Sequence, residues 1–397
     1  MAEQICICIA LKCFYASAEC SAMGLDPLKT NLAVADTARG NSAACLAVTP
    51  ALKALGVKER SRISEIPEDL DCIISAPRMD MYMRISVQIY GICLRFVSHE
   101  DIHICTIDEM FINVSPYLEL YGKTPREFAR MLMDEIMRET GIGSAAGIGT
   151  NLFLAKVALD ITADDLPDSI GYLDEGKFRQ TVWEHQPMTD IWGIGRVTAA
   201  RLERLGARTL KDITCIPEES LYNVFGPTAE YLIDHANGRE SCTIKDIQSY
   251  EPKSRSISNC RILPGDNSCK DAPAVLKEMT AELVDELMIK ALCAGSVALS
   301  VKYSDRNIKH TGGVRKLTER TDSYEKISDA LERLFTETTR IGYPVKSIVI
   351  SFGFLTYERF EDLIIISAPV HEKNQCIGNR HVKNSVACGM AVFGKSG

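Results

Sequence analysis

Residues 9–20 read IALKCFYASAEC, and this stretch decides how the chain begins to fold. The apolar residues that lead into it have the composition of a buried strand, whereas the residues after Cys13 suit a helix. Two aromatic side chains, Phe14 and Tyr15, stand at the corner between the two elements. We therefore expect a strand over 4–10 that turns directly into a helix, with aromatic rings at the turn.

The composition indicates a soluble protein of several domains. A chain of 397 residues, 46% hydrophobic and 25% charged, is expected to form about two to four globular domains. No apolar stretch reaches the ~20 residues of a membrane helix, and no secretory signal pattern opens the chain. The 15 cysteines form no CxxC pair or zinc-ligand spacing. We interpret them as reduced, small apolar residues of a cytoplasmic protein without a membrane partner.

The charge of the chain is acidic overall but basic in one segment. The net charge of −8 argues mildly against a nucleic-acid partner. Residues 300–320, however, carry six basic side chains and two acidic ones, a local charge of +4. Such a patch can bind phosphates without making the whole protein adhere to nucleic acid.

The order of the expected elements suggests at least two folded parts. Before residue 166 short strands, among them 32–36 and 43–48, alternate with helices, an α+β pattern. One such helix starts after Thr124 with a capping box and stops at Gly141. From about 166 to 240 the pattern is only helical. A second α+β unit begins near Lys253 with the order β-α-β-β-α-β, which suggests one sheet with two helices on one face.

Two local motifs could carry chemistry, and each has a simpler interpretation. Asp108 and Glu109 lie in TIDEMF, where apolar strand residues flank adjacent acids; they fit either a Mg²⁺ site or, more often for such a pair alone, a solvated turn. Gly193 and Gly195 in WGIGR, followed by Arg196, fit either a helix-hairpin-helix that holds a DNA phosphate or an ordinary helix connection.

Other candidates are single side chains. Lys156 in NLFLAKVALD could hold a phosphate, as could Lys53, although a lone lysine is usually a solvated surface residue. Tyr15 beside Phe14 is more often packing than function.

Taken together, five motifs resemble those of one family. CFYASAE, PALKALGV (50–57), TIDEMFINVS, AAGIGTNLFLAKVALD and WGIGR occur in the order and spacing of the Y-family translesion DNA polymerases, in the UmuC-like branch that includes the DNA polymerase IV and V types. The resemblance covers about residues 4–355.

The resemblance implies an α+β multidomain fold shaped like a right hand. Residues 1–34 and 76–165 would form the palm and 35–75 the small fingers. Residues 166–240 would form a helical thumb with a helix-hairpin-helix, and 245–355 a β-α-β-β-α-β little finger. Residues 356–397 would be a C-terminal tail.

The resemblance also implies roles for particular residues in template-directed synthesis. Asp108 would bind Mg²⁺, Glu109 would help activate the primer 3′ oxygen, and the carbonyl of Leu11 would contact the second of two metal ions.

Lys53 and Lys156 would hold the triphosphate of a deoxynucleotide. Phe14 would support that nucleotide, and Tyr15 would be the steric gate that excludes a ribose 2′-hydroxyl.

Primer-template DNA is the implied macromolecular partner. Its backbone would be bound by Gly193, Gly195 and Arg196 in the thumb, and by Lys302, Arg315 and Lys316 in the little finger.

A sliding clamp is a second implied partner. Its peptide would fall at residues 360–366, FEDLIII, where the Gln and the terminal aromatic of the usual motif are missing.

One departure from the family lies in the opening stretch itself. The family has Asp where this chain has Ala10, and that Asp bridges both metal ions. Asn113 also stands where many relatives have Asp. Two main hypotheses are a translesion polymerase of strongly reduced activity and a catalytically silent DNA-binding protein on the same fold. A third is a palm-fold nucleotide cyclase, which the hairpin and the little finger argue against.

Overall fold

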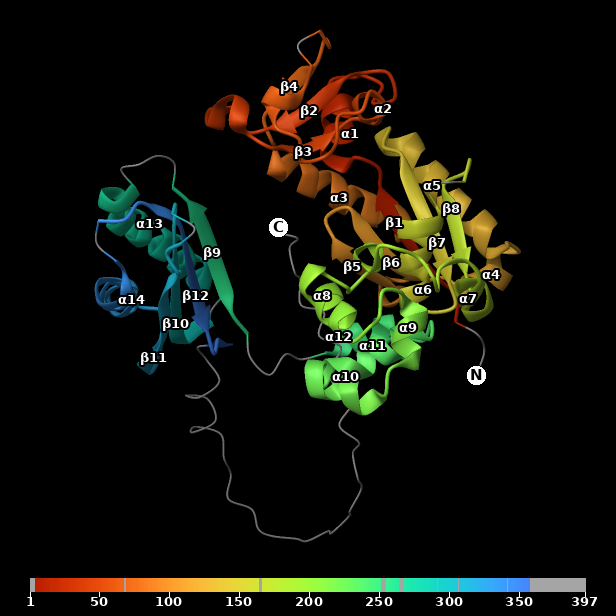
Figure 1. Cartoon of the computed structure of the whole chain (residues 1–397). Coiled ribbons are helices and arrows are strands. Elements are labelled where there is room, and N and C mark those ends of the chain that lie inside the picture. The colour runs from red at the N-terminus through yellow and green to blue at the C-terminus, as the bar shows by residue number, and fades with distance from the viewer. Residues whose placement is uncertain are drawn as a thin grey trace, which may run out of the picture. The chain divides into compact units, whose positions relative to one another are not determined.

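The computed structural model describes most of the chain (Figure 1). The described residues are 4–67, 69–163, 166–250, 255–263, 268–290, 292–305, 307–340 and 342–357. They fall into two compact units that meet in sequence between Tyr250 and Glu251. Among these residues, none of the helices combines the length and apolar character needed to cross a bilayer.

A five-stranded sheet forms the centre of the first unit. Its strand order is β5-β6-β1-β7-β8, with β1 antiparallel to both β6 and β7. The strands are β1 (Cys6–Leu11), β5 (Ile102–Thr106), β6 (Glu109–Asn113), β7 (Ser144–Gly149) and β8 (Ile170–Leu173). The strand β8 corrects the expectation of an all-helical segment after residue 166. It pairs in parallel with β7, because IGYL is apolar enough to extend the buried sheet.

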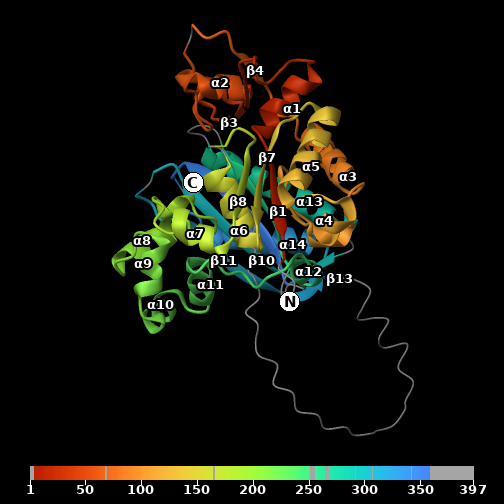
Figure 2. The same cartoon turned by 90° about the vertical axis from the view of Figure 1, so that its right-hand side faces the viewer.

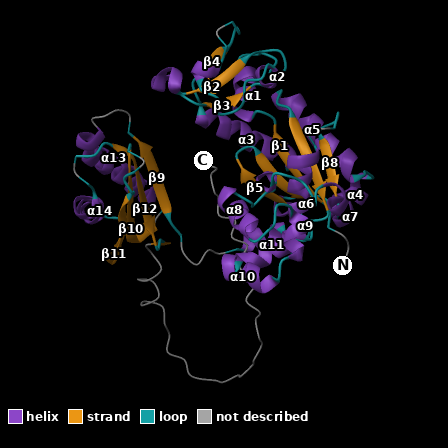
Figure 3. Cartoon of the chain, in the orientation of Figure 1, coloured by secondary structure: helices purple, strands orange, loops and turns teal. Residues whose placement is uncertain are grey.

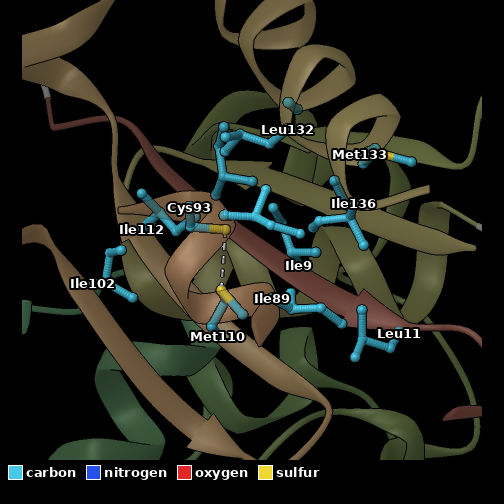
Figure 4. Close-up of a cluster of buried hydrophobic side chains, with 14 of the residues drawn as sticks. Ile9, Leu11, Ile89, Cys93, Ile102, Met110, Ile112, Leu132, Met133 and Ile136 are labelled. Carbon is cyan, nitrogen blue, oxygen red and sulfur yellow. Dashed lines mark hydrogen bonds between the residues drawn. The ribbon is translucent and has the colours of Figure 1, made fainter. Parts of the chain in front are cut away.

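Helices cover both faces of this sheet (Figure 2). The helices α3 (Met79–Cys93) and α5 (Pro125–Thr140) lie on the face that carries Ile9 and Leu11 (Figure 4). The helix α6 (Leu152–Val157) lies on the opposite face and continues into a π-helical turn, Ala158–Thr162. The capping box at the start of α5 is present as expected, and so is its left-handed stop at Gly141.

A smaller sheet and a group of short helices complete the first unit. The sheet has the order β3-β2-β4, and its strands confirm the two short strands expected near 32–36 and 43–48. Its elements are β2 (Leu32–Ala35), β3 (Cys45–Val48), α2 (Pro50–Ala54) and β4 (Ile73–Ser75). The remaining helices, shown in purple in Figure 3, are α1 (Phe14–Ala22), α4 (Ser115–Tyr121), α7 (Glu175–Thr181), α8 (Arg196–Arg204), α9 (Leu210–Cys215), α10 (Glu218–Phe225), α11 (Thr228–Ala236) and α12 (Ile244–Ser249).

The second unit has the expected order β-α-β-β-α-β. Its sheet runs β11-β10-β12-β9, with the short β13 paired to β10. The elements are β9 (Ile257–Ile262), α13 (Ser268–Ile289), β10 (Leu292–Tyr303), β11 (Thr311–Thr321), α14 (Tyr324–Thr338), β12 (Val345–Gly353) and β13 (Thr356–Tyr357). Both helices pack on the face of the sheet that carries Val297, Leu299 and Ile350, so no described residue of this unit's helices covers the other face, which is called the uncovered face below.

Candidate functional site

The corner after β1 is held by backbone hydrogen bonds from two sides. The amide of Leu11 donates to the carbonyl of Asp108 at 2.9 Å, and the amide of Lys12 donates to the carbonyl of Gly143 at 2.8 Å. The Ser17 hydroxyl then donates to the carbonyl of Lys12 at 2.8 Å. The strand-to-helix turn is therefore fixed against the β5–β6 turn, which carries the adjacent acids.

Ala10 lies in a cross-strand row with one of these acids. In the sheet register Ala10 is opposite Glu109 on β6 and opposite Ala145 on β7. Directly opposite residues of antiparallel strands point to the same face, with Cβ atoms roughly 5 Å apart. An acidic side chain at position 10 would therefore stand beside Glu109, whereas the alanine contributes only a methyl group.

Lys156 occupies this face in the described structure. Its ammonium donates to Glu109 Oε1 and to Asp160 Oδ1, each at 2.8 Å, and its side chain is only 8% exposed. Burial alone would lower the pKa of Lys156, but the negative charges of Asp160 and Glu109 outweigh burial and raise the pKa above its ordinary value. The sequence-predicted Lys156 and Glu109 are thus brought together, and Asp160 joins them.

The close approach of α6 to β7 depends on glycine. A Cβ atom at Gly147 would lie 2.1 Å from the carbonyl oxygen of Ala155, and one at Gly149 would lie 2.2 Å from the amide nitrogen of the same residue. Only a strand without side chains at these two positions lets the helix lie this near, and the helix carries Lys156 to the sheet.

Asp108 has a different neighbour from Glu109. Its Oδ1 accepts a hydrogen bond from the Thr106 hydroxyl at 2.7 Å. Burial raises the pKa of the Tyr15 phenol, and the negative charge of Asp108 raises it further. The two adjacent acids therefore have different neighbours: Asp108 accepts a hydrogen bond from Thr106, and Glu109 pairs with Lys156.

The aromatic residues at the corner form a stacked group. Phe14 is buried, and the Tyr15 ring is stacked on Tyr82 of α3 with centroids 4.6 Å apart. Tyr82 also meets Phe14 edge to face at 6.2 Å. Tyr15 is thus backed by a fully buried ring that the sequence alone did not single out.

The other predicted residues lie outside this cluster. Lys53 of α2 is exposed and pairs with Glu59 at 3.7 Å. Gly193, Gly195 and Arg196 are exposed around the buried Ile194. At Gly193 φ is +85°, and a Cβ atom there would lie 2.4 Å from the Tyr231 hydroxyl.

In the second unit, the predicted basic residues divide between the two faces of the sheet. Lys316 and Lys302 are exposed, and sheet register places them in rows with Ser296 and Ser347 on the uncovered face. Arg315 points the other way and pairs with Glu337 of α14 at 2.6 Å. Arg306, and the clamp-like peptide 360–366, lie outside the described residues.

Sequence reasoning missed Asp160, Glu19 and Tyr82. Asp160 had a usable signal, since it follows Lys156 by four residues on one helical face. Glu19 is the one charged residue of α1, whose other residues are aromatic or small, and this also marks it as a buried, paired charge. Within the described residues, no three His, Cys, Asp or Glu side chains are arranged to hold a metal ion.

The fold defines the class of protein. A chimeric Y-family DNA polymerase built from Dbh and Dpo4 matches with a TM-score of 0.70, covering 89% of this chain and 100% of the chimera at 22% identity. The chain therefore has the fold of the Y-family DNA polymerases.

The sequence comparisons identify the family. The impB/mucB/samB family matches residues 9–160, and its C-terminal domain matches residues 254–363. The putative UV-damage repair protein UvrX of Bacillus subtilis (strain 168) is 30% identical over 301 residues, 75% of this chain and 70% of UvrX. DNA polymerase IV 2 of the same organism is 28% identical over 364 residues, 90% of this chain and 85% of that protein. The chain belongs to the impB/mucB/samB family.

Proposed function

We propose that this chain is a template-directed DNA polymerase of the translesion type whose nucleotidyl transfer is strongly slowed by Ala10. The observation that carries the proposal is the row Glu109–Ala10–Ala145, in which a methyl group replaces the carboxylate expected next to Glu109. Family membership and fold support the polymerase, and the row supports its impairment.

The donor set fits one divalent cation better than two. The carboxylates of Asp108 and Glu109 are hard oxygen donors, and Mg²⁺ is commonly held by one or two carboxylates together with substrate phosphates and water. A pair of ions bridged by a third carboxylate does not fit, because Ala10 has no side-chain oxygen. A Mg²⁺ ion bound here would neutralise charge on the triphosphate.

The roles proposed for the chain's own residues follow from their positions. Asp108 and the Leu11 carbonyl are proposed to orient the triphosphate end of the site, and Lys156 to bind phosphate after exchanging one of its carboxylate partners. The ring of Tyr15 would exclude a 2′-hydroxyl, with Phe14 supporting the sugar. Lys53, exposed on α2, would reach the phosphates from the fingers.

The proposed partner is primer-template DNA. Exposed glycines at 193 and 195 allow backbone amides to approach a phosphate, and Arg196 adds a positive charge at the start of α8. Lys302 and Lys316 supply charge on the uncovered face of the second sheet. The palm, fingers, thumb, little-finger and tail ranges remain part of the proposal, as do the sliding clamp and a cytoplasmic location.

A catalytically silent DNA-binding protein is the second candidate. Two observations favour it: Ala10 itself, and the ion pair that engages Glu109 with Lys156. Such a protein would bind primer-template and nucleotide but would not join them.

Primer extension separates the two candidates. The chain is compared with Ala10→Asp and with Ala10→Asn, a control of similar size that adds no charge, in Mg²⁺ and then in Mn²⁺. We expect Ala10→Asp to extend primers ~10³–10⁶ times faster than the unaltered chain, because about 4–8 kcal/mol of transition-state stabilisation returns. Binding to labelled primer-template is measured for all three proteins.

Each outcome has a definite meaning. Measurable and equal extension rates for the chain and Ala10→Asp would refute the role given to Ala10. Tight DNA binding by all three proteins without extension by any would support the silent protein. Absence of primer-template binding would refute both candidates.

A further inference from the structure

A buried carboxylate stands behind the aromatic corner. Glu19 of α1 has a side chain that is 0% exposed. It accepts hydrogen bonds from Arg78 Nε at 3.0 Å and Nη2 at 2.5 Å, from the Tyr82 hydroxyl at 2.7 Å and from the Ser75 hydroxyl at 3.1 Å. A buried charge needs such partners, so the carboxylate and its donors constrain one another.

The donors come from the segment that leaves the smaller sheet. Ser75 is the last residue of β4, Arg78 precedes α3, and Tyr82 lies in the first turns of α3. Glu19 lies on α1, five residues after Phe14 and four residues after Tyr15. Its hydrogen bonds therefore connect the segment after β4 to α1. The carboxylate has few alternative geometries, because a guanidinium presents its donors in a fixed plane.

Tyr82 connects this charge to the proposed sugar site. Its hydroxyl is held by Glu19, and its ring stacks on Tyr15 at 4.6 Å with an angle of 24° between the planes. A ring held at both its hydroxyl and its face cannot slide without breaking one of these contacts. The position of Tyr15 consequently depends on Tyr82, and through it on Glu19.

We propose that Glu19 and Tyr82 are positioning residues that hold Tyr15 where it discriminates deoxyribonucleotides from ribonucleotides. The inference rests on the proposed function of Tyr15 and extends it to residues that do not touch the nucleotide. Loss of the backing ring lets Tyr15 withdraw, so a 2′-hydroxyl is accommodated while the phosphate contacts are unchanged.

Nucleotide binding tests this inference independently of Ala10. The full chain is bound to a primer-template whose primer ends in a dideoxynucleotide, with dG as the templating base and Mg²⁺ present. The dissociation constants of dCTP and CTP are measured. The readout is the discrimination ratio, the dissociation constant of CTP divided by that of dCTP. A role in folding alone would weaken the binding of both nucleotides equally and leave this ratio unchanged.

The variants divide the network into its parts. Tyr15→Ala removes the gate and should bring the ratio near one. Tyr82→Leu should lower the ratio about fivefold, as expected for the loss of one aromatic pair. Tyr82→Phe keeps the ring and should retain most of the discrimination, and Glu19→Gln should fall between these two. The matched control is Tyr90→Leu, on the same helix and packed against the same core, which should leave the ratio unchanged.

A double variant gives the sharpest result. If Tyr82 acts through Tyr15, adding Tyr82→Leu to Tyr15→Ala produces no further change in the ratio. The inference is overturned if Tyr15→Ala lowers the ratio but Tyr82→Leu does not, or if the two effects multiply. Failure of the unaltered complex to bind either nucleotide would instead overturn the proposed function, and this inference with it.

Discussion

At the scale of single residues, Lys156 and the acids around it set the charge of the site. Glu109 and Asp160 each contact its ammonium, and their side chains are 22% and 28% exposed. Removal of one partner from a largely buried group of charges leaves the others without compensation. The same lysine is thus expected to matter for stability as well as for nucleotide binding.

Replacing this lysine gives a direct prediction. We expect Lys156→Met to lower the free energy of unfolding by about 2 kcal/mol, less than for a fully buried pair because water reaches both carboxylates. The exposed Lys245→Met serves as the control and should change stability little. Urea unfolding at neutral pH measures both. Equal stability of Lys156→Met and the unaltered chain would contradict the importance of this ion pair.

Glu19 gives a prediction about pH. Burial raises the pKa of Glu19, but the hydrogen bonds from Arg78, Tyr82 and Ser75 outweigh burial and lower the pKa below its ordinary value of 4.5. The ionised carboxylate therefore stabilises the fold at pH values above 4.5, and this contribution is lost as the pH falls through the lowered pKa.

The measurement is the free energy of unfolding as a function of pH. The unaltered chain should lose stability more steeply than Glu19→Gln as the pH falls from about 5 to about 3, because Glu19 takes up a proton in this range and a glutamine at the same position does not. Parallel curves for the two proteins would show that Glu19 does not titrate in this way.

At the scale of elements, the contact between α6 and β7 decides whether Lys156 reaches the sheet. The carbonyl oxygen of Ala155 lies where a Cβ atom at Gly147 would be, at 2.1 Å. A backbone carbonyl cannot move aside as the end of a flexible side chain can. A methyl group at Gly147 must therefore push α6 away from β7.

The corresponding prediction compares two glycines. Gly147→Ala should destabilise the protein by about 3 kcal/mol, as overpacking does in a dense core. It should also weaken nucleotide binding, since Lys156 moves with α6. Gly143→Ala, in the same region but with nothing within 4 Å of the new methyl group, is the control. A stable Gly147→Ala protein with normal nucleotide affinity would argue against this packing as the determinant.

At the scale of the whole molecule, a net charge of −8 must be reconciled with the proposed binding of DNA. The structure offers a local solution in the second unit. Lys302 and Lys316 lie on the face of the sheet that its helices leave uncovered, whereas Arg315 is paired with Glu337 on the helix side. Binding should therefore depend on a few positive charges on one face.

Salt dependence tests this arrangement. Lys316→Gln should weaken binding to primer-template for all sequences alike, and should lower the slope of log affinity against log salt by about 1. Lys277→Gln, on α13, removes the same charge from a covering helix and is the matched control. Identical slopes for the two variants would show that the uncovered face does not bind the DNA backbone.

Much of the fold could be predicted because its signals are local. The capping box at Thr124, the stop at Gly141 and the β-α-β-β-α-β order each depend on residues close in sequence, and the structure confirms them. The strand β8 escaped prediction because four residues of IGYL give too short a pattern to distinguish a strand from a loop. Only its pairing with β7 makes it a strand.

The candidate site also combines features that the local sequence predicts with contacts that it does not predict. The sequence by itself determined that two acids are adjacent at 108 and 109, that aromatics follow β1, and that Ala10 offers no oxygen, since these are properties of the residues and their order. Only the tertiary structure decided that Lys156 lies against Glu109 and that Tyr82 and Glu19 support Tyr15. These contacts join residues 47 to 67 positions apart. The physical reason is that sheet register and helix packing, which no local pattern specifies, set the distances between such residues.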